Sequence, residues 1–163
     1  MTNRQRIEAA FTHHQPDRTP IFEYVLLSPV ADAVLGRRYA DFGGDLADWA
    51  DYAREIGNYD RAVRQYAIDR IELAAKLGHD MIYCIKNPTE DIMNYYPAPP
   101  VSVPPADDPV EVVAERNRQS REALEKPQNM QTLLIYQYLR EEMDRRGMDL
   151  PIYAAAFFHG IWT

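Results

Sequence analysis

Apolar residues recur at helical spacing in three stretches of the first half of the chain. Residues 2–13 begin with a Thr-x-x-Gln capping box, which satisfies the first free backbone N–H groups of a helix. Residues 46–56 have a helical pattern, and the strongest pattern covers residues 58–77, where Gly78 is placed to end the helix. The inward stripe of that last stretch consists of Val63, Tyr66, Ala67, Ile71 and Ala74. The sequence therefore predicts three helices here.

Two more helices are expected in the second half. The run Asp-Pro-Val-Glu at residues 108–111 places favoured residue types at the cap, the first and the third helical positions, and Pro127 interrupts the helix that follows. A last helix is expected over residues 129–146, with Gly147 as its stop. Between the two halves, residues 95–105 contain five prolines, so we expect neither a helix nor a central strand there.

Three short apolar runs have the composition of strands covered on both faces: residues 21–27, 79–85 and 151–158. Strands separated by helices are parallel, with right-handed connections. The order of elements therefore predicts an α/β fold with a parallel sheet.

The amino-acid composition argues against some classes of binding partner. The chain carries 25 acidic and 18 basic side chains, a formal net charge of −7, which argues against a nucleic-acid partner. Cys84 is the single cysteine, so no intrachain disulfide forms, and we expect it in the core. No apolar run approaches the roughly 20 residues of a membrane span, and the first residues do not resemble a signal peptide. We expect a cytoplasmic protein with a small-molecule substrate.

Three motifs resemble the uroporphyrinogen decarboxylase-like superfamily. Residues 16–20 (Pro-Asp-Arg-Thr-Pro) resemble its opening, residues 77–83 (Leu-Gly-His-Asp-Met-Ile-Tyr) its second barrel strand, and residues 158–163 (Phe-His-Gly-Ile-Trp-Thr) the segment after its third strand. The resemblance implies a (β/α)8 TIM barrel of about twice this length. Residues 1–163 would then be the N-terminal portion of a single barrel domain, ending after the third strand.

The superfamily has two large branches, and the residues favour one of them. Its decarboxylases carry arginines just after the first strand and an aspartate after the second. Here residues 25–29 contain no basic side chain, and Asn87 stands at the aspartate's position. The other branch comprises cobamide-dependent methyltransferases that use zinc, whose His-x-Cys and Cys ligands lie beyond the part of the barrel that this chain resembles.

We therefore expect an enzyme nearer the methyltransferase or uncharacterised branch, with no metal site in this chain. The resemblance implies zinc and a corrinoid protein for the complete enzyme. One alternative is a uroporphyrinogen decarboxylase, a lyase of porphyrin biosynthesis. Another is a non-catalytic binding or structural module formed by the 163 residues alone. Against it, we expect the isolated piece to expose strand edges and apolar surface, and so to self-associate or fold poorly. The sequence also leaves open whether the protein forms a homodimer.

Barrel active sites form at the carboxyl ends of the strands, which selects candidate residues. Glu23 is costly in an apolar strand unless it faces the barrel mouth, pairs with a cation or starts the strand in solvent. Asn87 and Lys86 either bind a carbonyl or anionic group or simply close the strand, as Asn-Pro favours. His159 is either a general acid–base group or a histidine satisfied by its loop. The expected catalytic residues are Asn87, His159 and Glu23, and the expected substrate-binding residues are Lys86, Tyr24 and Trp162.

Overall fold

The computed structural model describes residues 1–94, 108–125 and 129–154. The chain divides into two compact units, one formed by Met1–Tyr96 with Gln131–Thr163 and the other by Pro97–Met130. The predicted His159 and Trp162 lie outside the described residues.

Four helices come first along the chain: α1 (Asn3–Phe11), α2 (Ser28–Leu35), α3 (Leu46–Ile56) and α4 (Tyr59–Leu77). The predicted capping box of α1 is present, with Thr2 and Gln5 bonded to each other's backbone N–H groups. Gly78 ends α4 in the left-handed conformation, at φ 69°. Three of these helices were expected from their caps and stripes, whereas α2 was not.

The remaining elements are β1 (Ile82–Cys84), the 3-10 helix η1 (Glu90–Asn94), α5 (Pro109–Glu125), the 3-10 helix η2 (Met130–Leu133), α6 (Leu134–Arg146) and β2 (Ile152–Ala154). Helix α5 belongs to the second unit. Asp108 accepts a hydrogen bond from the N–H of Val110, as the predicted cap requires. Gly147 ends α6 with φ 64°.

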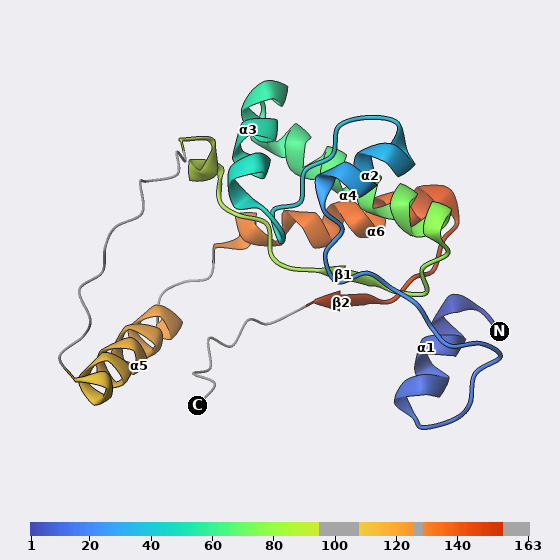
Figure 1. Cartoon of the computed structure of the whole chain (residues 1–163), viewed down its shortest axis with the longest axis horizontal. Helices are drawn as coiled ribbons and strands as arrows, with labels where there is room; N and C mark the ends of the chain where they lie inside the picture. The colour runs from blue at the N-terminus through green and yellow to red at the C-terminus, as the bar shows by residue number, and fades with distance from the viewer. Residues whose placement is uncertain (95–107, 126–128, 155–163) are drawn as a thin grey trace. The chain divides into compact units, whose positions relative to one another are not determined.

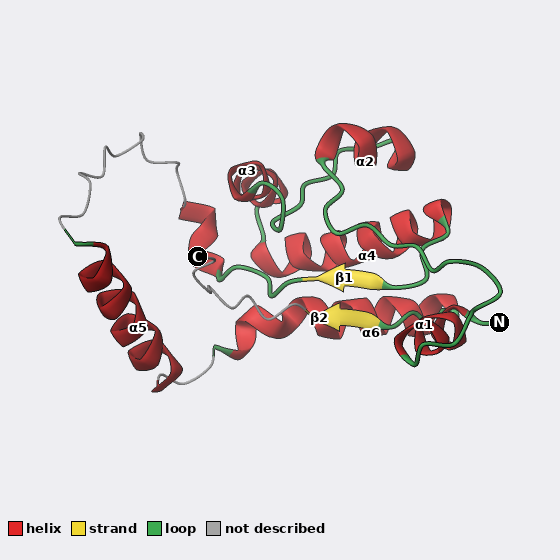
Figure 2. Cartoon of the chain, turned by 60° about the horizontal axis from the view of Figure 1, so that its bottom comes forward, coloured by secondary structure: helices red, strands yellow, loops and turns green. Residues whose placement is uncertain are grey.

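The strands β1 and β2 pair in parallel, with Ile82 opposite Ile152 and Cys84 opposite Ala154. Figure 1 shows α4 and α6 on the same side of this small sheet, and Figure 2 shows the two strands side by side. The predicted α/β character and the parallel pairing are confirmed. The described residues form a mostly helical structure with a two-stranded sheet, and no barrel is evident among them.

The strand predicted over residues 21–27 was wrong. These residues form no strand, and Ile21, Phe22, Tyr24 and Leu27 are exposed. They do lie beside β1, because the N–H of Asp80 donates to the carbonyl of Ile21 at 2.8 Å. Further along, the carbonyl of Tyr83 accepts from Arg70 of α4 at 2.7 Å, which takes an acceptor that a neighbouring strand would use.

Of the two other predicted strands, the first is shorter than expected. The run over 79–85 forms a strand only at β1. Of the run over 151–158, the structure describes β2, and residues 155–158 lie outside the described part.

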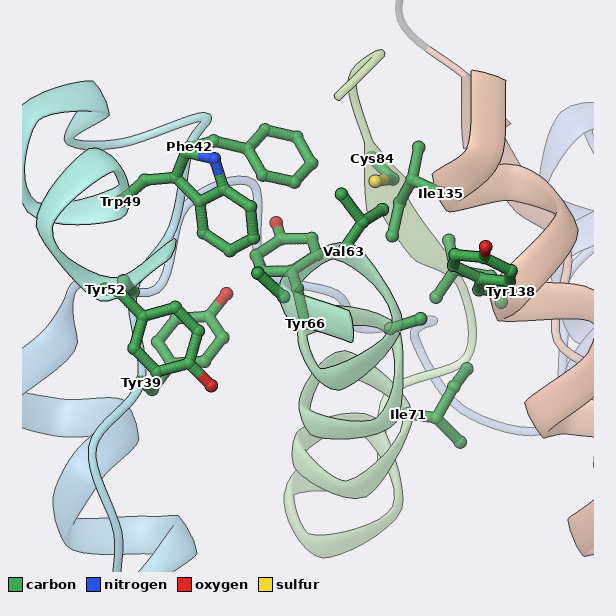
Figure 3. Packing of buried hydrophobic residues seen from close by; sticks show 14 of the residues in the cluster. Tyr39, Phe42, Trp49, Tyr52, Val63, Tyr66, Ile71, Cys84, Ile135 and Tyr138 are labelled. Atoms are coloured by element: carbon green, nitrogen blue, oxygen red, sulfur yellow. The ribbon is translucent and has the colours of Figure 1, made fainter. Parts of the chain in front are cut away.

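Aromatic residues fill the core between α3, α4 and the loop that precedes α3. The ring of Trp49 meets Phe42 and Tyr66 edge-on, with centroids 5.2 and 5.7 Å away (Figure 3). The predicted stripe of α4 is buried, and it continues toward Ile135 and Leu139 of α6. Burial of apolar surface, at about 25 cal/mol per Å², is the main favourable contribution to folding, and this cluster is where the first unit gains it.

Candidate functional site

The β1–β2 sheet has two faces with different surroundings. Ile82 and Cys84 belong to the buried cluster that also contains residues of α4 and α6, so we call their side the covered face. Successive side chains of a strand point to opposite faces. Tyr83 therefore points the other way, and we call that side the open face.

A row of three tyrosines defines the open face. The ring of Tyr83 lies 4.2 Å from that of Tyr24 and 5.8 Å from that of Tyr153, with interplanar angles of 34° and 30°. Tyr24 and Tyr153 are half exposed, whereas Tyr83 between them is buried. Residues from three separate segments thus line up across the sheet. Tyr24 was predicted as a substrate-binding residue, but its two partners were missed, because the row follows from strand register and not from local sequence.

Asn87 lies just after β1 and is fully buried. Its amide group donates to the Tyr59 hydroxyl at 2.5 Å and to the Gln131 carbonyl at 2.8 Å, and its side-chain oxygen accepts from the N–H of Ile135 at 3.0 Å. Its backbone N–H donates to the carbonyl of Thr132 at 3.1 Å. Asn87 therefore ties the end of β1 to the starts of α4 and α6. Its predicted catalytic role stays a prediction, and the geometry assigns it a positioning role.

Glu23 and Lys86 are both exposed. Glu23 lies close enough to His79 to favour its charged form, but burial and the charge of Arg70 outweigh this and lower the pKa of His79. The Asn87 side chain, in contrast, is buried. Their predicted roles in a site stay predictions.

A glycine turn lies against the segment that neighbours β1. A Cβ atom on Gly44 would stand 2.7 Å from Cγ1 of Val25 and 3.2 Å from Cδ2 of Leu27. Only glycine allows this approach. The turn is held by Asp41, whose carboxylate accepts from the N–H of Gly43 at 2.8 Å and from the Tyr66 hydroxyl at 2.9 Å.

A charge network closes the opposite, amino end of β1. The fully buried Asp80 accepts from Arg6 at 2.5 Å, from Arg18 at 2.7 Å and from the N–H of Ile21 at 3.0 Å. Asp17 in turn accepts from Arg6 at 2.7 Å. Burial alone would raise the pKa of Asp80, but these hydrogen bonds and both guanidinium charges lower it overall. The Pro-Asp-Arg-Thr-Pro motif and Asp80 are thus joined by ion pairs and hydrogen bonds into one structural network, which we call the latch.

A shallow depression of about 220 Å³ lies between α4 and α6. It is lined mainly by charged side chains, among them Arg64, Glu141 and Arg145. Arg64 is already engaged by Glu141 at 2.8 Å and by the ring of Tyr138 at 4.0 Å. This depression is therefore part of the ion-paired helix surface.

Within the described ranges, no three His, Cys, Asp or Glu side chains gather as metal ligands would. Cys84 is buried, as expected for a core residue, and burial raises its pKa to about 12. None of the described helices is long and apolar enough to cross a membrane.

No protein-family model, no curated protein and no solved structure matches the chain. The geometry of the chain itself therefore carries the functional argument.

Proposed function

We propose that the chain is part of a β/α-barrel enzyme of the uroporphyrinogen decarboxylase-like superfamily, nearer its methyltransferase or uncharacterised branch than its decarboxylases. One observation carries the proposal. Residues 21–27, β1 and β2 follow one another in space in chain order, with helices against one face and the tyrosine row on the other. In a parallel barrel the face away from the helices is the interior. The tyrosines would then line the chamber.

The tyrosine row suits a substrate with a flat or apolar surface. Tyrosine rings offer a large apolar area and a hydroxyl that donates or accepts one hydrogen bond. Stacked side by side, they would exclude water from one wall of the chamber and leave the hydroxyl groups for orientation. Asn87 would fix this wall by holding the carboxyl end of β1 against α4 and α6.

The first arginines that follow residues 21–27 support the choice of branch. Arg37 donates to Asp69 at 2.5 Å and to Glu72 at 2.8 Å. Arg38 donates to Asp48 at 3.0 Å and also pairs with Glu55. Both guanidinium groups are therefore engaged on the helix side of the unit, and neither is available to hold the many carboxylates of a porphyrinogen.

Zinc does not fit the described residues, which offer no cluster of ligands. The resemblance assigns the zinc ligands and the contact with a corrinoid protein to other parts of the barrel. Zinc bound there would activate a thiol or a methoxylated substrate. The contribution of this chain is one wall of the chamber and its support.

The test uses the protein expressed from its complete reading frame. We expect bound zinc by elemental analysis and methyl transfer between a corrinoid and a thiol or methoxylated substrate. A Tyr24→Ala variant should lose methyl transfer but keep its zinc, because the row contacts substrate and not metal. A metal-free protein would contradict the methyltransferase proposal, and turnover of uroporphyrinogen would establish the decarboxylase alternative instead.

A further inference from the structure

The two ring contacts of the tyrosine row are held in place by different means. Tyr83 and Tyr153 stand opposite each other in the register of β1 and β2, so backbone pairing fixes their rings. Tyr24 lies in a segment that forms no strand, yet its ring is nearer to that of Tyr83, at 4.2 Å against 5.8 Å. Contacts other than strand pairing therefore place Tyr24.

The backbone ties the start of this segment to the residues beside β1. The N–H of Asp80 donates to the carbonyl of Ile21 at 2.8 Å, three residues before Tyr24. Further along β1, the carbonyl of Tyr83 accepts instead from the guanidinium group of Arg70 in α4, at 2.7 Å. The end of the segment that follows Tyr24 needs another support.

The turn of residues 41–44 touches both the segment and the residue that follows β1. A Cβ atom on Gly44 would stand 2.7 Å from Cγ1 of Val25, and a Cβ atom on Gly43 would stand 3.6 Å from Cδ1 of Ile85. Val25 directly follows Tyr24, so a contact that limits where Val25 can lie also limits where the Tyr24 ring can lie.

Asp41 holds this turn in one conformation. Its carboxylate accepts from the N–H of Gly43 at 2.8 Å and from the hydroxyl of Tyr66 in α4 at 2.9 Å. Its backbone carbonyl accepts from the N–H of Gly44 at 2.9 Å. The turn is thus fixed to α4 and cannot yield easily when a neighbour presses on it.

Arg70 connects the turn to β1. Its guanidinium group lies 3.8 Å from the second carboxylate oxygen of Asp41, and both side chains are only 5% exposed. The same guanidinium group donates to the carbonyl of Tyr83. One buried ion pair therefore refers the turn, and with it Val25, to the strand residue that carries the neighbouring ring.

We propose that the 41–44 turn and Arg70 are a positioning device that sets the spacing of the Tyr24 ring from the Tyr83 ring. Gly44 is its sensitive point. A methyl group there would have to separate from Cγ1 of Val25 by about 0.7 Å, from 2.7 Å to the 3.4 Å of an ordinary contact. Valine is stiff at χ1, so the segment itself would move. Under the proposed function, on which this step rests, that spacing decides how closely the row fits its ligand.

The experiment measures nuclear Overhauser cross-peaks between tyrosine rings in the 163-residue chain. The wild type should show cross-peaks from Tyr24 to Tyr83 and from Tyr83 to Tyr153. The variant Gly44→Ala should lose most of the first intensity and keep the second, because strand pairing holds the second contact. A general loosening of the fold would weaken both.

A compensating change and a matched control sharpen the measurement. Gly44→Ala/Val25→Ala removes the clashing Cγ1 atom and should restore the Tyr24 cross-peak. Gly36→Ala adds the same methyl group where no atom lies within 4 Å, but at a φ of 70°. It should lower the urea midpoint because of backbone strain and leave both cross-peaks unchanged.

A second variant covers the case in which Gly44→Ala does not fold. Asp41→Asn/Arg70→Met removes both charges together, so no buried charge is left unpaired. It cuts the link between the turn and β1, and it should also weaken the Tyr24 cross-peak alone. A wild type without this cross-peak, an equal loss at both contacts, unchanged intensities in the variants, or no rescue by Val25→Ala would each overturn the proposal.

The consequence for a ligand is measured on the protein from the complete reading frame. Gly44→Ala should raise KM about tenfold and leave kcat and bound zinc nearly unchanged, because the row contacts substrate and not metal. Gly44→Ala/Val25→Ala should restore KM. The ring cross-peaks need neither zinc nor turnover, so a metal-free or inactive wild type would count against the proposed function alone.

Discussion

On the covered face of the β1–β2 sheet, Ile82 and Cys84 are almost completely buried against α4 and α6. On the open face, one residue away along the same strand, Tyr83 is covered by two tyrosines that are themselves half exposed. Helices of the first unit cover one face of the sheet, whereas the described residues leave the tyrosines at both ends of the row on the other face half exposed. The difference separates the residues that hold this unit together from those that are free to contact a ligand or a partner.

The largest expected loss of stability comes from removing a buried side chain on the covered side of the sheet. Ile71→Ala removes a fully buried side chain of α4. We expect a loss of about 2–5 kcal/mol in the free energy of unfolding, because the cavity adds to the lost transfer energy. Leu27→Ala, the matched change at an exposed position in the segment beside β1, should cost less than about 1 kcal/mol. Urea denaturation measures both, and equal losses would remove the distinction between the faces.

The second largest loss of stability is expected at Asn87, which holds the carboxyl end of β1. In Asn87→Asp a carboxylate replaces an amide that donates to the carbonyl of Gln131. We expect a loss of about 2–4 kcal/mol at pH 7, because a buried charge would face carbonyl oxygens.

The folded-state pKa of the new carboxyl group should be raised. Its destabilising effect should therefore shrink as the pH falls and the group binds a proton. Urea denaturation at pH 7 and pH 5 measures this. An unchanged stability at pH 7 would mean that Asn87 does not anchor the strand, and would weaken the argument against the decarboxylase branch.

A smaller effect tests the latch at the amino end. Asp80→Asn should cost about 1–3 kcal/mol at neutral pH, because the amide cannot replace a carboxylate that accepts from two guanidinium groups. The pKa of Asp80 is lowered in the folded chain, so its contribution is complete above about pH 3.9, the ordinary aspartate pKa, and is lost as the pH falls through the folded value. Acid unfolding of the wild type should therefore be steeper than that of the variant. Parallel acid curves would contradict this role.

The smallest expected effect is a difference in chemical reactivity between side chains of the wild-type chain, which leaves its stability unchanged. The thiol of Cys84 should not react with a disulfide reagent at pH 8 until the chain is unfolded, because it is buried and its pKa is raised to about 12. In dilute wild-type chain, Tyr24 and Tyr153 should be nitrated faster than the buried Tyr66. A thiol that reacts in the native chain would show that the covered face opens.

The helices were predictable because their signals are local. The caps of α1 and α4, the inward stripe of α4 and the glycine after it all lie within a few residues of the boundaries that they set. Helix α2 was missed although Ser28 and Pro29 begin it and Gly36 ends it, because attention to this region went to the apolar run over residues 21–27, which was interpreted as a strand.

The faces of the sheet were less predictable, for a physical reason. Residues 21–27 have the apolar composition of a buried strand, but composition does not say which neighbours are present to cover them. The tyrosine row depends on the register of β1 against β2, and the bonds of Asp80 to Arg6 and Arg18 join residues at least 62 positions apart. The motifs that suggested the family contain Arg18 and Asp80, but they do not show that these two residues pair with each other.

The central claim is that the open face is an interior surface of a larger parallel barrel. The most direct test is a crystal structure of the protein expressed from its complete reading frame. We predict that Tyr24, Tyr83 and Tyr153 lie inside a closed ring of parallel strands that contains β1 and β2. An open sheet whose tyrosine row faces solvent, or strands that run antiparallel to β1, would contradict the account.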